Sequence, residues 1–287
     1  KNTVSSSTTN VDADALFGDD YDVNYPKIID INSGVTIGGS GDEAIDIPSG
    51  LAGSLTINNA GIVIGFGGAS AGAAGGSAIN CASSGVTINN TGQISGGGGA
   101  GNVGGAGGNG SYTTSSTVNE TRQFYSQYYS SVQVTNDGTF WMYLGSSASS
   151  SRSNGSACVP CHPAGYLVSQ GNYVSYGWYK IALSGNWTTS TTNSSTGGAG
   201  GSFGVGAGYN QSATNGTSGA SGSNNAGNGG AGSNGAALGT AAATSSAGSN
   251  GNVSNGAAGN AGGAAGAAVT GTSVAMNNTG TLHGAVA

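Results

Sequence analysis

Proline, leucine, cysteine and charge are all scarce in this chain. Its 287 residues include 4 prolines, 3 cysteines and 8 leucines, and 6% of them are charged. So little proline excludes a collagen triple helix, although glycine is abundant. Because no segment shows an apolar period of 3.6 residues, we expect almost no α-helix. No apolar run approaches 18 residues, so no membrane-spanning helix is expected, and the low charge is atypical of ordinary disorder.

The few charges are unevenly distributed. Nine of the eleven acidic residues lie between Asp12 and Asp46, which gives residues 1–46 a net charge of −7 and the remainder a net charge of +1. The absence of a basic stripe excludes a nucleic-acid partner. Beyond residue 46 the only carboxylates are Glu120 and Asp137, which do not predict a catalytic pair or a metal site. We therefore expect no enzymatic activity, no metal and no cofactor.

Glycine is abundant and periodic, with 59 copies in the chain. The runs with a spacing of three are Gly98-Gly101-Gly104-Gly107-Gly110, Gly198-Gly201-Gly204, Gly216-Gly219-Gly222, Gly229-Gly232-Gly235 and Gly256-Gly259-Gly262. A period of three matches an extended helix with three residues per turn, one edge of which would carry no side chains. Backbones can approach along such edges and hydrogen-bond, which predicts a bundle of polyglycine-II helices. A flexible glycine–serine linker of similar composition is the alternative.

A strand–turn–strand motif occurs three times. The copies are SLTINNAGIVIG at 54–65, GVTINNTGQISG at 85–96 and SVAMNNTGTLHG at 273–284, with a partial copy, GVTIG, at 34–38. Alternating apolar residues predict half-buried strands, and Asn-Asn-x-Gly predicts a turn because Asn and Gly tolerate positive φ. Repeats of this kind stack to bury their apolar faces. We expect the last copy to complete a β platform begun by the first two, with the intervening residues forming an excursion from it.

The segment 111–196 differs chemically from its glycine-rich flanks. It contains nine of the twelve tyrosines and all three tryptophans. Ser131–Thr135 and Thr139–Leu144 flank an Asn-Asp-Gly turn and predict a hairpin, and Tyr173–Leu183 predicts further β structure. Tyrosine and tryptophan populate binding loops, although the same rings could form a core for the insertion. The candidate contact residues are Tyr125, Tyr128, Tyr129, Trp141, Tyr143, Tyr166, Tyr173, Tyr176, Trp178 and Tyr179.

Within the insertion, Cys158-Val159-Pro160-Cys161-His162 matches the C-x-x-C-H pattern of covalent haem attachment. Three interpretations stay open: a haem site, a disulfide between Cys158 and Cys161, and a pair of free thiols. The third cysteine, Cys81, is most simply a small buried residue.

The order of these segments resembles that of tail-fibre tip proteins of tailed bacteriophages. The resemblance is to the glycine-rich distal adhesins of T-even-like phages and to the C-terminal ends of siphophage central fibres. It rests on GVTINNTGQISGGGGAGNVGGAGGNG, the aromatic insertion, GGAGGSFGVGAGYNQSATNGTSGASG and GAAGNAGGAAGAAVTGTSVAMNNTGTLHGAVA, and it covers about residues 30–287. It implies stacked polyglycine-II helices that display variable loops, here 111–196, to an outer-membrane protein or a surface glycan of the host.

The resemblance also implies a place at the distal tip of the tail or tail fibre of the virion, outside the cell. The acidic N-terminal segment would then join other tail or fibre proteins. A monomer and a homotrimer both remain open.

We therefore predict an all-β, non-helical receptor-binding adhesin without enzymatic activity. Its expected parts are an acidic N-terminal junction (1–33), β repeats with the first glycine ladder (34–110), the aromatic receptor-facing insertion (111–196), a polyglycine-II bundle (197–271) and a closing β repeat (272–287). The alternatives are a structural glycine-rich extracellular fibre or matrix protein and a haem-bearing filament subunit.

Overall fold

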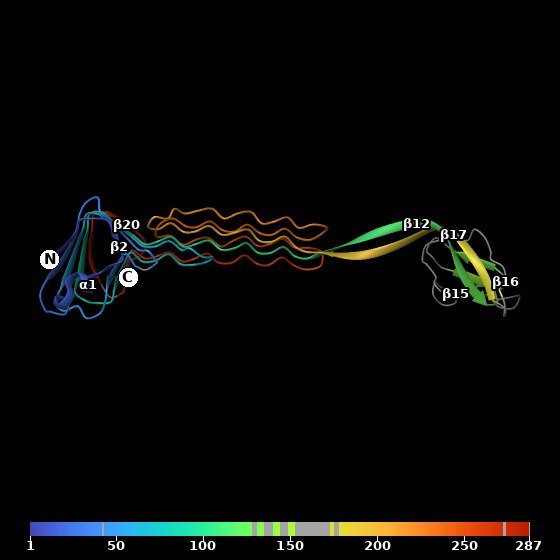
Figure 1. Ribbon diagram of the computed structural model, residues 1–287, viewed down its shortest axis with the longest axis horizontal. Helices are drawn as coiled ribbons and strands as arrows, with labels where there is room; N and C mark the ends of the chain where they lie inside the picture. The colour runs from blue at the N-terminus through green and yellow to red at the C-terminus, as the bar shows by residue number, and fades with distance from the viewer. Residues whose placement is uncertain are drawn as a thin grey trace. The chain divides into compact units, whose positions relative to one another are not determined.

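The computed structural model describes residues 1–41, 43–127, 131–134, 140–143, 149–152, 173–174, 178–271 and 274–286. For some of these, all in strands, it describes the backbone alone: residues 118–127, 131–134, 140–143, 149–152, 173–174 and 178–188. The chain forms two compact units, Lys1–Ser111 with Ser194–Ala287, and Tyr112–Asn193 (Figure 1). Across the described residues the only α-helix is α1 (Ala13–Phe17), followed by the 3-10 turn η1 (Gly18–Asp20). The expectation of an all-β, non-helical protein is confirmed.

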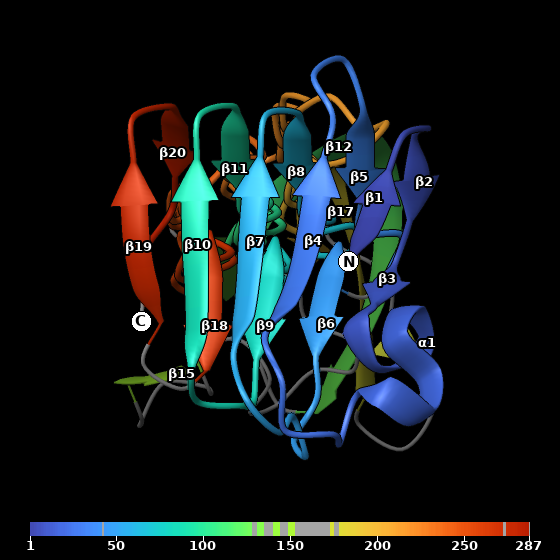
Figure 2. The same ribbon diagram turned by 90° about the vertical axis from the view of Figure 1, so that its left-hand side faces the viewer.

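The first unit contains a parallel β-solenoid with three faces, which we call the β platform. Its first sheet is β1 (Asn2–Val4), β4 (Lys27–Ile31), β7 (Leu55–Asn59), β10 (Val86–Asn90) and β19 (Ala275–Asn278). The second is β2 (Thr8–Thr9), β5 (Thr36–Gly38), β8 (Ile62–Ile64), β11 (Gln93–Ser95) and β20 (Thr281–His283). The third is β3 (Val11–Asp12), β6 (Ile45–Ile47), β9 (Ile79–Cys81) and β18 (Val269–Gly271). Each of the first four coils adds one strand to each sheet, and the last coil adds β19 and β20 to the first two sheets. The first sheet faces the viewer in Figure 2.

The core of the platform comes from the period-two pattern of its strands. In the first sheet, β4, β7 and β10 alternate buried and half-buried positions. Strand pairing stacks Ile29, Ile57 and Ile88 in one column, and all three are fully buried. Each such isoleucine contributes roughly 1.5–3 kcal/mol relative to an exposed one.

Asparagine side chains form two ladders across the first sheet. In the half-exposed ladder, Asn277 donates to Asn89 (2.9 Å), Asn89 to Asn58 (2.8 Å) and Asn58 to Asp30 (2.8 Å). Hydrogen bonds from Lys1 and then Asn58 hold the pKa of the Asp30 carboxyl below its usual value.

The inner ladder runs the opposite way. Asn59 donates to Asn90 (2.8 Å), and Asn90 donates to Asn278 (2.7 Å), with Asn59 and Asn90 both buried. The Asn-Asn pair of each repeat therefore cross-links the coils as well as leading into a turn.

The predicted β repeats stack as expected. Residues 85–96 pair in parallel with both 54–65 and 273–284 through β10 and β11. The partial copy at 34–38 takes the place of the second strand of the motif, because β5 pairs with β8. The first strand of that coil is β4, whose sequence KIIDI lacks the Asn-Asn pair.

Residues 1–33 do not stand apart from the repeats. They supply β1–β4, and β4 pairs along its whole length with β7. Lys27 occupies a core position on β4, where its Nζ donates to the carbonyls of Val23 (2.7 Å) and Ala52 (2.8 Å). The acidic segment thus forms an end of the solenoid.

The glycine-rich residues leave the platform at one corner, between its second and third sheets. The connection there is Asn10 alone in the first coil, residues 39–44 in the second, 65–78 in the third and 96–268 in the fourth. The last connection also contains the insertion. Residues 65–78, 96–110 and 197–268 run side by side in extended conformation, and we call them the glycine lattice (Figure 1).

Backbone hydrogen bonds in the lattice repeat every three residues, as the glycine period predicted. The amides of Gly98, Gly101, Gly104 and Gly107 donate to the carbonyls of Ala207, Gly204, Gly201 and Gly198. Segment 96–110 is central and bonds to six others: 65–70, 73–78, 197–208, 226–237, 240–250 and 254–268. The lattice is therefore bonded in several directions, and a freely flexible linker is excluded for these residues.

A segment that hydrogen-bonds to more neighbouring segments has glycine at more of its three repeating positions, and each such position forms one column of glycines along the segment. In the central segment, an added Cβ at Gly101 would lie 1.9 Å from the Ser233 carbonyl oxygen, and one at Gly105 would lie 2.2 Å from that of Ala257. Two of every three positions there face another backbone. Segment 211–223 bonds only to 197–208 and 226–237, and it has the single column Gly216-Gly219-Gly222.

The described residues of the second unit, Tyr112–Asn193, form two three-stranded sheets. One is ordered β12 (Gly110–Gln127), β17 (Trp178–Ser195) and β16 (Tyr173–Val174), and the other β13 (Ser131–Val134), β14 (Phe140–Tyr143) and β15 (Ser149–Arg152). The predicted hairpin strands do pair, antiparallel, as β13 and β14. The Asn-Asp-Gly turn lies outside the described residues.

Candidate functional site

The insertion leaves the lattice as a ribbon made of β12 and β17. Thr114 Oγ1 donates to the Thr191 carbonyl (3.4 Å), and Ser115 Oγ lies 3.0 Å from Ser190 Oγ, so the strands run antiparallel. Residues 113–117 and 189–192 are all exposed serines and threonines. A ribbon exposed on both faces has no core, so cross-strand pairs of this kind stabilise it.

Six of the ten predicted contact residues lie on described strands. Tyr125 is on β12, Trp141 and Tyr143 on β14, Tyr173 on β16, and Trp178 and Tyr179 on β17. Tyr128, Tyr129, Tyr166 and Tyr176 lie outside the described residues, as do Cys158 and Cys161 of the C-x-x-C-H motif.

Strand register divides the β13–β14–β15 sheet into two chemically different faces. Positions directly opposite one another share a face, and the face alternates along each strand. One face therefore carries Trp141 and Tyr143 with Ser131, Gln133, Ser149 and Ser151, and we call it the Trp141–Tyr143 face. The other carries Val132, Val134, Phe140 and Met142 with Ser150 and Arg152.

This division matches a sheet with one apolar side and one side for recognition. Antiparallel sheets commonly pack one face on a core and leave the other in water. Tryptophan and tyrosine among small polar residues are typical of binding surfaces. The sequence identifies both rings as candidates, but it does not define which residues of β13 and β15 share their face, because the register of β14 depends on turns whose length the sequence does not define.

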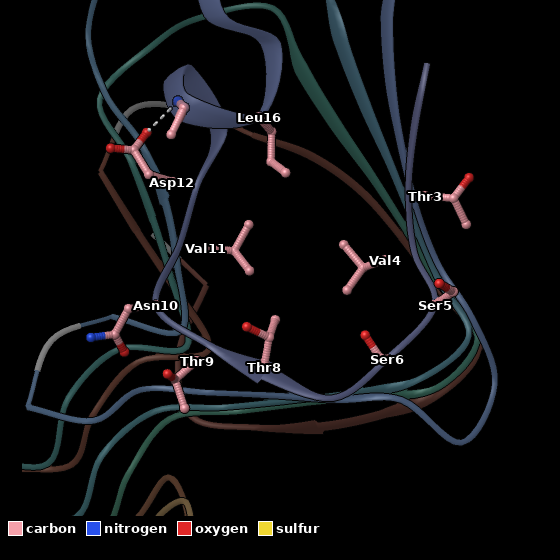
Figure 3. A pocket seen from close by; sticks show the side chains of 11 residues that line it. Thr3, Val4, Ser5, Ser6, Thr8, Thr9, Asn10, Val11, Asp12 and Leu16 are labelled. Carbon is pink, nitrogen blue, oxygen red and sulfur yellow. Dashed lines mark hydrogen bonds between the residues drawn. The ribbon is translucent and has the colours of Figure 1, made fainter.

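The platform has a second distinctive feature at its N-terminal end. Each of β1, β2 and β3 is paired on one side only, and together they border a cavity of about 420 Å³. Val4, Thr8, Val11 and Leu16 point into it (Figure 3). No repeat motif marks this coil in the sequence, which is why sequence analysis did not find the cavity.

Acidic residues lie beside this open end. Asp14, Asp19 and Asp22 line a hollow of about 510 Å³ together with Tyr21. Burial raises the pKa of the Tyr21 phenol, whose hydroxyl donates to the Pro48 carbonyl (2.6 Å). The end of the solenoid therefore combines unpaired strand edges, a cavity lined by both apolar and polar residues, and negative charge.

Other chemistry is sparse in the described part of the chain. No three of its His, Cys, Asp and Glu residues are grouped as metal ligands would be. Its helices include none long and apolar enough to cross a membrane. Cys81 is buried, as predicted, and its thiol donates to the Ser83 carbonyl (3.0 Å).

Comparison with known proteins gives a family. The family model of the phage tail fibre adhesin Gp38 matches residues 1–177, which is more than half of the chain. No curated protein matches the chain. Among solved structures, the crystal structure of the gp37-gp38 adhesin tip complex of the bacteriophage S16 long tail fiber matches with 18% identity and a TM-score of 0.40, over 100% of this chain and 82% of that one.

The family match extends from the first coil of the platform through the central lattice segment into the insertion. The structural similarity is too weak to add an argument. The chain belongs to the phage tail fibre adhesin Gp38 family and is a receptor-binding adhesin of the distal tail-fibre tip.

Proposed function

We propose that the insertion, residues 112–193, binds the host receptor, and that the Trp141–Tyr143 face is its contact surface. The proposal is supported by the register of β14, which puts Trp141 and Tyr143 on the same face as Gln133 and serines of β13 and β15. Tyrosine and tryptophan bury large areas at low entropic cost and keep a polar tip for directional bonds. Such a face suits either a folded protein or a glycan, on whose sugar rings aromatic side chains stack.

Substitutions on this face are expected to weaken receptor binding strongly. Trp141→Ser combined with Tyr143→Ser should lower the affinity of the purified chain for host cells at least ~30-fold, which is the effect of losing a hot spot of about 2 kcal/mol. Tyr112→Ser is the matched control, because Tyr112 belongs to the same unit but lies at the start of the ribbon. The measurement is competition with phage for adsorption. An unchanged affinity in the double variant would reject this face.

Treatment of the cells separates the two receptor classes. Protease digestion of the host surface should abolish binding to a protein receptor, whereas mild periodate oxidation should abolish binding to a glycan. The same treated cells serve for the parent chain and the double variant.

We also propose that the open end of the platform docks onto another tail-fibre protein. Three strand edges, each unpaired on one side, can extend their sheets with strands from a partner. The cavity, lined by Val4, Leu16 and several serines and threonines, can take a side chain of the partner, and the net charge of −7 over residues 1–46 favours a basic partner surface.

Val4→Lys is expected to block assembly while receptor binding persists. A lysine at this position places a long charged side chain in the cavity, next to the hydrophobic core that Val4 packs against, so incorporation of the chain into fibres should fall at least ~10-fold. Val286→Lys, an exposed valine in the last coil, is the control. Incorporation is measured by complementing particles that lack the chain. Normal incorporation of Val4→Lys, or equal loss in the control, would contradict docking at this end.

A further inference from the structure

Two turns of the lattice meet where the chain enters and leaves the insertion. In turn 223–226 the amide of Ala226 donates to the Ser223 carbonyl, and in turn 251–254 the amide of Gly251 donates to the Ser254 carbonyl. Asn252 N donates to the Asn225 carbonyl (3.1 Å), which links the turns directly. We call this pair of turns the root clamp.

The clamp holds the first root of the ribbon through asparagine side chains. The Asn252 amide makes two bonds to Ser111: Oδ1 accepts from its N–H (2.7 Å), and Nδ2 donates to its carbonyl (3.0 Å). Asn225 Nδ2 donates to the same carbonyl (3.0 Å). The side chain of Asn252 therefore takes the place of a peptide group on a neighbouring strand, where the backbone of β12 begins.

The clamp also holds the second root. Ser195 Oγ donates to the Asn224 carbonyl (2.8 Å), at the end of β17. Next to it, Gly197 N donates to Asn109 Oδ1 (3.3 Å), and Asn109 N donates to Ser254 Oγ (2.8 Å). Both ends of the insertion are thus tied to the same two turns by polar side chains.

The backbone conformation of turn 223–226 gives an independent reason to infer that asparagine is present at position 225 for its side chain. Asn224 and Asn225 have φ of 48° and 68°. Glycine adopts positive φ without the cost that other residues bear there, and this chain uses glycine 59 times. At position 225 the asparagine amide bonds to Ser111, a contact that glycine would lose.

We propose that Asn225 and Asn252 are positioning residues for receptor binding, a role that rests on the proposed function of the insertion. They keep the two roots of the ribbon paired and fixed to the lattice. A virion-borne adhesin then searches for its receptor with fewer orientations of the contact surface, so less entropy is lost on binding. The binding surface itself does not include them.

The test compares Asn225→Gly combined with Asn252→Ala against Asn224→Gly. Asn224→Gly tests the backbone alone, since its positive φ matches that of Asn225 and its contact with Ser195 uses the carbonyl. In the double variant, amide exchange at residues 113–117 and 189–193 should accelerate at least ~10-fold, because the three side-chain hydrogen bonds to Ser111 are lost. Exchange within 96–107 should stay unchanged, which shows that the lattice is folded.

Two binding measurements separate positioning from damage to the fold. The soluble double variant should bind host cells within ~2-fold of the parent, whereas virions carrying it should adsorb at least ~5-fold more slowly. Asn252→Asp, which keeps the acceptor and loses the donor, should give an intermediate rate.

Several outcomes would overturn the proposal: unchanged exchange in the double variant, equal effects of Asn224→Gly, or normal adsorption despite faster exchange. If the insertion is not the binding unit, a chain that lacks the insertion will still bind host cells. That result distinguishes failure of the proposed function from failure of the positioning role.

Discussion

A chain whose residues 112–193 are replaced by a four-residue Gly-Ser bridge is expected to fold and to bind no host cells. The remaining residues form one compact unit with its own core and its own hydrogen-bonded lattice. Ser111 and Ser195 both contact turn 223–226, so a bridge that reaches about 13 Å can join them.

The expected loss of adsorption is at least ~100-fold, since a few central residues carry most of the binding energy of an interface. Binding is measured by pull-down from host outer membranes and by competition with phage. The control is the heat capacity of unfolding of the first unit, together with amide exchange over 96–107. Full adsorption by a folded, bridged chain would place the receptor site elsewhere, for instance in the turns of the lattice.

Gly101→Ala is expected to destabilise the first unit severely. The new Cβ would lie 1.9 Å from the Ser233 carbonyl oxygen and 3.0 Å from that of Asn234, both backbone atoms that cannot rotate away. Segment 96–110 is bonded on six sides, so moving it breaks contacts in every direction. We expect a loss of about 3 kcal/mol or more in the free energy of unfolding. The gain of roughly 0.5–1 kcal/mol from replacing glycine is smaller than this loss.

The matched control is Ala106→Val on the same segment. Ala106 is exposed, so the larger side chain projects into solvent, and we expect a change within about 0.5 kcal/mol. Both variants are compared by calorimetry and by urea unfolding. Similar stability of Gly101→Ala and the parent would mean that the lattice tolerates side chains at its centre, which is incompatible with the close backbone contacts described above.

Local periodicity in the sequence determined the two kinds of backbone structure in this protein. A period of two with Asn-Asn-x-Gly turns specifies strands that bury alternate residues, and a period of three in glycine specifies extended segments that pack without side chains between them. Both follow from where the Cβ atoms fall around the chain, so they could be predicted without knowledge of distant contacts. The rings of Trp141 and Tyr143 were identifiable as candidates by composition alone.

Tertiary structure decided which partners those segments take. The sequence did not reveal that residues 1–33 are the first coils of the solenoid, because β4 lacks the Asn-Asn pair. Nor did it reveal that 96–110 is the centre of the lattice, that Asn225 and Asn252 meet at Ser111, or which residues of β13 and β15 share a face with Trp141 and Tyr143. These features depend on contacts between residues far apart in the chain. Such contacts are fixed by register and by the stacking of coils, which local propensity does not encode.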